Sequence, residues 1–176
     1  MNIVLIGYRG AGKSAVGEVL SARLGMPCVD MDTAIARRAG MSIPEIVEKF
    51  GWSKFRDMES REARELSELD NVIMDTGGGV IERPGNMEVL RKNACTFWLK
   101  ASVDTIVSRI QGGAERPALT SGKTFTEEVA EVLERRTPAY RIAAQHEIDT
   151  DGLAPEQVAE RIIEIWIKKK QGRDAE

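Results

Sequence analysis

The residues whose types and spacing point most directly to chemistry form a phosphate-binding loop near the N-terminus. Residues 7–14 have the sequence GYRGAGKS, which matches the pattern G-x-x-x-x-G-K-[ST]. Glycines let successive backbone N–H groups turn towards an anion, and the helix expected to follow adds its positive N-terminal end. Lys13 can reach the β- and γ-phosphates, and the Ser14 hydroxyl can bind Mg²⁺. The loop predicts a nucleoside triphosphate and magnesium, and leaves the acceptor open.

Carboxylates and glycines at the ends of two further apolar runs are candidates for the acceptor side. Asp32 follows the run at 27–30, where a carboxylate can hold a magnesium-bound water or accept a proton from an attacking hydroxyl. A helix N-cap is the alternative role for Asp32, and the two roles are compatible. Asp75 ends the run at 72–75 and can serve the metal's water shell. Three glycines at 77–79 follow; they allow close backbone approach to a ligand, or form a flexible turn.

Arginines supply the cationic side of the predicted site. Arg56 lies near a helix start, Arg136 lies in a later helical pattern, and Arg116 lies in the glycine-containing stretch 111–124. A pair such as Arg56 and Arg136 is what an acidic acceptor needs, because guanidinium binds carboxylate through two parallel hydrogen bonds. A loop arginine that closes over the nucleotide can neutralise charge on the transferred phosphoryl group. Each arginine taken alone is more typical of a solvated surface position.

The elements that must position these residues are short apolar runs alternating with helical patterns. Strands are expected at 2–7, 27–30, 72–75, 95–99 and 146–149, and helices at 13–24, 32–39, 43–50, 53–69, 85–92, 103–110, 125–143 and 155–170. Strands separated by helices predict parallel pairing in a layered α/β domain. We expect one kinase domain over 1–170, with an acceptor-binding region at 31–70 and a lid at 111–124, followed by a polar tail at 171–176.

Composition excludes several classes of protein. The chain has 176 residues and a formal net charge of -3, without the basic excess of a nucleic-acid or membrane-surface binder. No apolar run approaches a membrane span, and the first strand leaves no room for a leader, so we expect a cytoplasmic protein. Cys28 and Cys95 are expected to be buried hydrophobes, and His146 a strand-edge residue. A lone short domain of this kind suggests a monomer.

Several classes of protein share such a loop. An oligomeric motor needs more residues than this chain has, and the Asn-Lys-x-Asp pattern for guanine is missing from the sequence. A small-molecule kinase is therefore favoured. A gluconate or nucleotide kinase is the alternative enzyme, although a neutral polyol does not need two arginines and a nucleotide needs a larger acceptor region. A nucleotide-binding regulator without turnover is the alternative from another class.

The sequence resembles the shikimate kinases from residue 2 to about residue 165. The matching pieces occur in family order: the loop at 7–14, Asp30-Met31-Asp32, Phe55-Arg56 with Glu59, Gly77-Gly78-Gly79, Arg116-Pro117, and Arg136 with Pro138 and Tyr140. The resemblance implies a five-stranded parallel sheet in the order 2-3-1-4-5, of the nucleoside monophosphate kinase type. It also implies ATP-dependent phosphorylation of the shikimate 3-hydroxyl, giving shikimate 3-phosphate and ADP on the route to chorismate and aromatic amino acids.

The resemblance further implies roles for individual residues of this sequence. ATP would be bound by Gly10, Ala11, Gly12, Lys13, Ser14, Ala15, Arg109, Arg116 and Pro155. Shikimate would be bound by Asp32, Arg56, Gly78 and Arg136, with its carboxylate on the two arginines. The catalytic residues would be Lys13, Asp32 and Arg116, and Mg²⁺ would be held at Ser14 and Asp32. The partners are thus a small molecule and a nucleotide, with no nucleic acid and no membrane.

Overall fold

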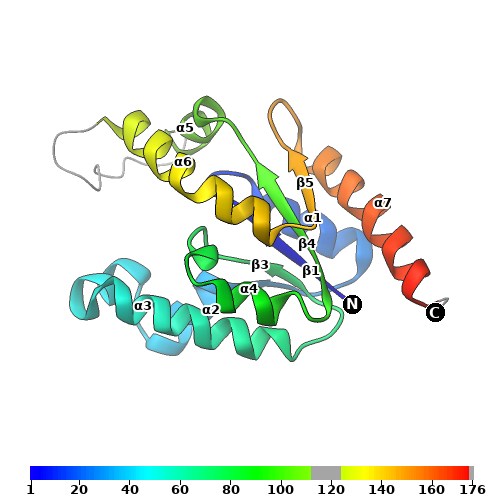
Figure 1. Cartoon of the computed structure of the whole chain (residues 1–176), viewed down its shortest axis with the longest axis horizontal. Helices are drawn as coiled ribbons and strands as arrows, with labels where there is room; N and C mark the ends of the chain where they lie inside the picture. The colour runs from blue at the N-terminus through cyan, green and yellow to red at the C-terminus, as the bar shows by residue number, and fades with distance from the viewer. Residues whose placement is uncertain (112–123, 175–176) are drawn as a thin grey trace.

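Five parallel strands form the centre of the molecule (Figure 1). The structure is a computed structural model that describes residues 1–111 and 124–174. The strands are β1 (Asn2–Ile6), β2 (Cys28–Asp30), β3 (Ile73–Asp75), β4 (Ala94–Lys100) and β5 (His146–Asp149). Their order in the sheet is β2-β3-β1-β4-β5, which confirms the expected order 2-3-1-4-5.

Helices connect the strands and cover both faces of the sheet (Figure 1). They are α1 (Lys13–Leu24), α2 (Met31–Ala39), α3 (Ile43–Ser67), α4 (Pro84–Leu90), α5 (Val103–Gln111), α6 (Phe125–Ala143) and α7 (Pro155–Asp174). A 3-10 helix, η1 (Val80–Glu82), follows the glycine triplet and was not predicted from the sequence. The last helix continues to Asp174, past the end at 170 that the sequence suggested.

Several helix boundaries lie where local sequence signals predict them. Gly25 ends α1 with a φ of 64°, and Ser42 begins α3 in a capping box with Glu45, as the sequence predicts. Gly51, with a φ of 80°, breaks α3 into the two helical stretches that the sequence predicted separately.

The N-cap role considered for Asp32 is wrong, because Asp30 fills it. Asp30 Oδ1 accepts a hydrogen bond from the backbone N–H of Thr33 at 3.0 Å. The helix α2 begins at Met31, so Asp32 lies inside its first turn. The side chain of Asp32 is therefore available for another partner.

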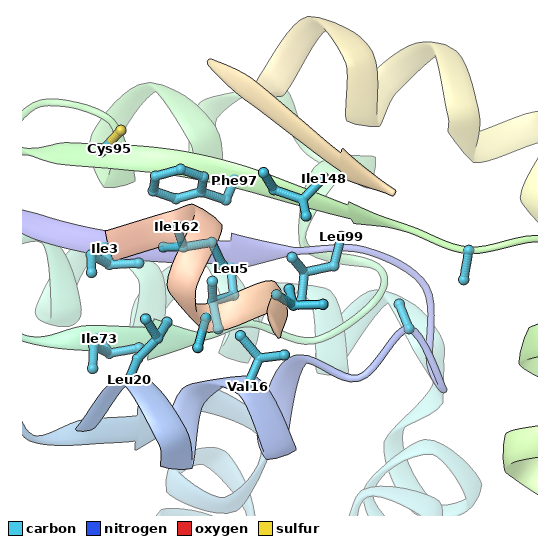
Figure 2. Close-up of a cluster of buried hydrophobic side chains, with 14 of the residues drawn as sticks. Ile3, Leu5, Val16, Leu20, Ile73, Cys95, Phe97, Leu99, Ile148 and Ile162 are labelled. Atoms are coloured by element: carbon cyan, nitrogen blue, oxygen red, sulfur yellow. The ribbon is translucent and has the colours of Figure 1, made fainter. Parts of the chain in front are cut away.

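One core fills the space between the sheet, α1 and α7 (Figure 2). Ile3 and Leu5 of β1 and Phe97 of β4 are fully buried on this face. They meet Val16 and Leu20 of α1. Side chains of Ile162 and its neighbours on α7 close the layer. Burial of this much apolar surface holds α1, and with it the phosphate-binding loop, against the carboxyl end of β1.

A second core lies on the opposite face of the sheet. Val4, Ile6 and Trp98 point to this face, because successive strand residues alternate. Trp98 stacks on Tyr140 of α6 with ring centres 5.7 Å apart. Most of the remaining members come from α2, α3, α4 and η1. The two cores show why the strands lack polar alternation: both faces are covered.

Cys95 and His146 lie where the sequence predicted, whereas Cys28 is less buried than expected. Both cysteines are free; Cys95 is buried and Cys28 is half-buried, and burial raises the pKa of Cys28 to about 11. His146 begins the edge strand β5 and stacks on Phe97 with ring centres 5.3 Å apart. Within residues 1–111 and 124–174, no helix combines the length and apolar character needed to cross a membrane.

Candidate active site at the carboxyl edge of the sheet

The phosphate-binding loop joins the end of β1 to the start of α1. Gly10 and Gly12 adopt φ angles of 82° and 97°, which other residues rarely adopt. At Gly10 the space is also closed, since a Cβ atom there would lie 2.9 Å from Ile110 Cγ1. Gly12 precedes α1 and has no side chain to cap it. The first N–H groups of a helix lack partners within the helix, so they remain available to an anion.

Lys13 lies in the first turn of α1, with its side chain folded back along the loop. The residue is 8% exposed. Its Nζ donates hydrogen bonds to the carbonyl oxygens of Gly7 at 2.9 Å and Tyr8 at 3.3 Å. Burial lowers the pKa of Lys13, and the charges of Asp75 and Asp32 oppose that shift. The ammonium group therefore lies in the loop among carboxylates, where it can meet the outer phosphates of a nucleotide.

Ser14 and Asp75 form a pair of oxygen ligands suited to magnesium. The Ser14 hydroxyl donates to Asp75 Oδ2 at 2.6 Å. Burial raises the pKa of Asp75, and the nearby Lys13 and Ser14 oppose the shift. Magnesium takes only one or two protein oxygens and fills its octahedron with water and phosphate. The described part of the chain has no cluster of three His, Cys, Asp or Glu side chains for a metal.

Asp32 has an unsatisfied oxygen inside the site. Its Oδ1 atom is buried and has no hydrogen-bond partner among the described residues. Burial raises the pKa of Asp32, the charge of Asp30 adds to this effect, and Lys13 opposes it. A buried carboxylate oxygen without a partner is costly unless a ligand satisfies it. The arrangement therefore favours a hydroxyl group of a ligand as the partner of Asp32.

The glycine triplet at 77–79 passes so close to the charged groups that side chains would collide with them. A Cβ atom at Gly77 would lie 2.6 Å from Asp32 Oδ1. One at Gly79 would lie 2.3 Å from both Nη atoms of Arg56. Close approach, rather than turn flexibility, is what these two glycines supply.

Arg56 reaches the glycine triplet from α3 and is held on several sides. Its side chain is 12% exposed, and its Nη1 atom pairs with Glu59, one turn further along the helix. Burial raises the pKa of Glu59, and Arg56 opposes the shift. The guanidinium also lies 5.4 Å from the ring centre of Trp52 and 5.3 Å from that of Phe55. These contacts fix its Nη atoms beside Gly79.

Arg136 reaches the same place from α6. Its side chain is 15% exposed, and its guanidinium lies 5.9 Å from the ring centre of Tyr8. A Cβ atom at Gly78 would lie 3.6 Å from Arg136 Nη1. One helical turn beyond, the Tyr140 hydroxyl donates to the Gly78 carbonyl oxygen. The helix α6 thus positions both an arginine and the Gly78 peptide.

Glu82, at the end of η1, joins the two arginines. Its Oε2 lies 3.2 Å from Arg56 Nε, and its Oε1 accepts a hydrogen bond from Arg136 Nε at 2.9 Å. Burial acts to raise the pKa of Glu82, but the charges of Arg136 and Arg56 outweigh it and hold the pKa below its usual range. Two guanidinium groups from α3 and α6 are therefore paired beside the glycine triplet, which suits a carboxylate ligand.

Arg109 of α5 ties the phosphate-binding loop to the loop after β5. Its Nη1 donates to the Gly10 carbonyl oxygen at 3.3 Å and to Thr150 Oγ1 at 3.1 Å, and its Nη2 donates to the Thr150 carbonyl oxygen at 3.0 Å. Pro155 begins α7 shortly after that loop. Arg109 thus lies beside Gly10 of the loop, and Arg116 lies outside the described residues.

The structure gathers most of the predicted site residues at one edge of the sheet. They are Gly10, Ala11, Gly12, Lys13, Ser14 and Ala15 of the loop and first helical turn, together with Asp32, Arg56, Gly78, Arg109 and Arg136. Sequence reasoning assigned no role to Glu82 or Thr150. Each is joined to the site by a contact between distant parts of the chain. A local sequence pattern does not predict such contacts.

The sheet order and the loop at the end of β1 are those of a P-loop phosphotransferase. The paired arginines beside Asp32 add a second site, so the class is a P-loop kinase with its own acceptor site.

Comparison with known proteins narrows this class. A family model described as shikimate kinase matches residues 9–166. A shikimate kinase of Thermodesulfovibrio yellowstonii is 40% identical over 172 residues, which is 98% of each chain. The structure of shikimate kinase from Acinetobacter baumannii in complex with shikimate is similar with a TM-score of 0.88 at 32% identity, covering 96% of this chain and 94% of that one. The chain belongs to the shikimate kinase family.

Proposed function

We propose that the chain transfers the γ-phosphoryl group of ATP to the 3-hydroxyl of shikimate, giving shikimate 3-phosphate and ADP. The observation that carries this proposal is the meeting of Arg56 and Arg136 at Gly78 and Gly79, close to Asp32 and the phosphate-binding loop. Membership of the shikimate kinase family supports it. This reaction lies on the route to chorismate and the aromatic amino acids.

The acceptor is oriented by its two polar ends. Its carboxylate lies on the Nη atoms of Arg56 and Arg136, and the Gly78 N–H contacts the ring. Its hydroxyl groups face Asp32, whose Oδ1 lacks a partner in the described chain. Because Asp32 has a raised pKa, it is a stronger base than an exposed aspartate and can take or orient the proton of the attacking hydroxyl.

Phosphoryl transfer requires little covalent chemistry from the protein, so positioning and charge stabilisation supply most of the catalysis. The N–H groups at the start of α1 and the ammonium group of Lys13 hold the outer phosphates in line with the acceptor hydroxyl. Arg109, beside Gly10, and Pro155, at the start of α7, contact the nucleoside. Arg116, outside the described residues, stays a prediction as the arginine that covers ATP.

Magnesium would be held by the Ser14 hydroxyl, with Asp32 and Asp75 orienting its water ligands. Bound there, the ion neutralises charge on the β- and γ-phosphates. The hydrogen bond between Ser14 and Asp75 keeps the hydroxyl aimed at this place. The monomeric state remains a prediction from the size of the chain.

A coupled assay of ADP release with ATP and Mg²⁺ tests the proposal on a panel of acceptors. The panel contains shikimate, gluconate, a neutral cyclic polyol and a nucleoside monophosphate. We expect turnover with shikimate far above that with the other three, and a product phosphorylated at the 3-hydroxyl by NMR. Preference for another acceptor would identify a different kinase, and ATP binding without any product would favour a regulator that has lost turnover.

A further inference from the structure

Glu82 is a charged residue beside the two arginines, and the proposed reaction gives it no role. It ends the 3-10 helix η1, three residues after Gly79, and 33% of its side-chain surface is exposed. Its carboxylate lies between an arginine from α3 and an arginine from α6. These two helices are far apart in sequence, and η1 contacts both. Glu82 is therefore placed to control how the two arginines sit relative to each other.

Glu82 contacts both arginines and leaves at least one outer nitrogen of each directed towards the glycine triplet. Glu82 lies 3.2 Å from the Nε atom of Arg56. It accepts hydrogen bonds from the Nε atom of Arg136 at 2.9 Å and from its Nη2 atom at 2.5 Å. The Nη atoms of Arg56 lie against Gly79, and Nη1 of Arg136 lies towards Gly78. Glu82 thus holds Arg56 at its Nε atom and Arg136 along its Nε–Nη2 edge, while both Nη atoms of Arg56 and the Nη1 atom of Arg136 lie towards the glycine backbone. A carboxylate lying over that backbone would meet these outer nitrogens without displacing Glu82.

The charges of the three side chains also indicate that Glu82 keeps the two arginines close together. Two guanidinium groups that are mostly enclosed repel each other, because little water separates or screens them. The carboxylate of Glu82 offsets this repulsion with one oxygen for each arginine. Without it, Arg136 would no longer be held by Glu82 and would move away from Arg56, which Glu59 still holds, before an acceptor arrives. Binding would then have to include the free energy of bringing the two arginines together again.

We infer that Glu82 is a positioning residue that prearranges Arg56 and Arg136 to receive the single carboxylate of the acceptor. The inference rests on the proposed function and deepens it, since it assigns the affinity for the acid group to a residue outside direct substrate contact. Glu82 acts through the arginines, so its effect is specific to acceptors that carry the carboxylate.

The test compares wild type with Glu82→Gln, which keeps the size of the side chain and removes the charge. Glu88→Gln is the matched control, because Glu88 is an exposed residue of the neighbouring helix α4. Binding of shikimate and of its methyl ester is measured by calorimetry, and steady-state constants are measured for shikimate and ATP. We expect Glu82→Gln to weaken shikimate binding and raise its KM by about tenfold, with kcat and the KM for ATP changed less than about twofold.

The methyl ester separates positioning from a general structural effect. The ester lacks the acid group, so its binding should be the same in wild type and Glu82→Gln, and Glu88→Gln should match wild type throughout. Tighter shikimate binding by Glu82→Gln would mean that Glu82 competes with the acceptor, which overturns the inference. Equal weakening of shikimate and ester also overturns it.

Failure of the proposed function would look different. If wild type binds shikimate but forms no product, the proposed function fails, while the effect of Glu82→Gln on binding still decides the inference. If wild type does not bind shikimate at all, both are wrong. A Glu82→Ala variant supplies a second measurement, and it should weaken shikimate binding at least as much as Glu82→Gln.

Discussion

Replacing Gly79 by alanine is expected to displace the guanidinium group of Arg56 by a distance that follows from the structure. The backbone at Gly79 has φ -101° and ψ 6°, a conformation open to alanine, so the substitution brings no backbone strain. The new methyl group would lie 2.3 Å from both Nη atoms of Arg56, whereas ordinary contacts begin at 3.4 Å. The guanidinium must therefore retreat by about 1 Å, and it can do so because it is the end of a flexible side chain.

A shift of this size at a binding group is expected to cost about 10- to 100-fold in KM for shikimate, or about 1.4 to 2.7 kcal/mol. The KM for ATP should change little, because the collision is with Arg56 and not with the phosphate-binding loop. The melting temperature should also change little, because the backbone around Gly79 need not move. Steady-state kinetics with each substrate varied, and a thermal unfolding curve, measure the three quantities.

Gly85→Ala is the matched control for this experiment. Gly85 lies in α4, and a Cβ atom there would meet nothing within 4 Å. This variant should keep the wild-type KM for both substrates. The reasoning would be refuted if Gly79→Ala kept the wild-type KM for shikimate, or if its KM for ATP rose by the same factor.

Four further outcomes follow from the site. Lys13→Ala should lose nearly all turnover while circular dichroism shows a retained fold; wild-type kcat in this variant would contradict its role. Arg136→Ala should raise the KM for shikimate by at least tenfold with ATP affinity little changed, and an unchanged KM for shikimate would count against the carboxylate role. Asp75→Asn should raise the Mg²⁺ concentration for half-maximal activity several-fold, and an unchanged Mg²⁺ titration would remove Asp75 from the metal's surroundings. The kcat should fall as the pH is lowered, because Asp32, whose pKa is raised, takes up a proton. Asp30→Asn keeps a capping side chain but removes a charge that raises the pKa of Asp32, so the acid side of the pH profile should move to lower pH. An unchanged pH profile in Asp30→Asn would exclude Asp32 as the titrating group.

Much of the fold follows from local sequence signals. The run Ile3–Ile6 predicts a strand buried on both faces, and all four side chains are fully buried. Gly25 and the pair Ser42 and Glu45 mark helix ends through chemistry that acts within a few residues. The order of the strands does not follow from such signals, because it depends on which strands meet in space. It was available only through the resemblance to a family.

The site also contains residues that a local motif predicts and residues that depend on contacts between distant parts of the chain. Lys13 and Ser14 could be named from one loop, because the chemistry of phosphate binding fixes their spacing. The sequence suggested Asp32 as a possible N-cap, but α2 begins one residue earlier than expected, so Asp30 is the capping residue. The role of Glu82 could not be predicted from the sequence, because it depends on contacts with two arginines from different helices.

The central claim is that one acidic acceptor lies with its carboxylate on Arg56 and Arg136 and its 3-hydroxyl at Asp32, facing the phosphate end of ATP. A crystal structure with shikimate and a non-hydrolysable ATP analogue tests this most directly. The account predicts the carboxylate over Gly78 and Gly79, within hydrogen-bond distance of both guanidinium groups, and the hydroxyl in line with the γ-phosphate. Shikimate bound in another orientation, or away from Asp32 and the two arginines, would contradict it.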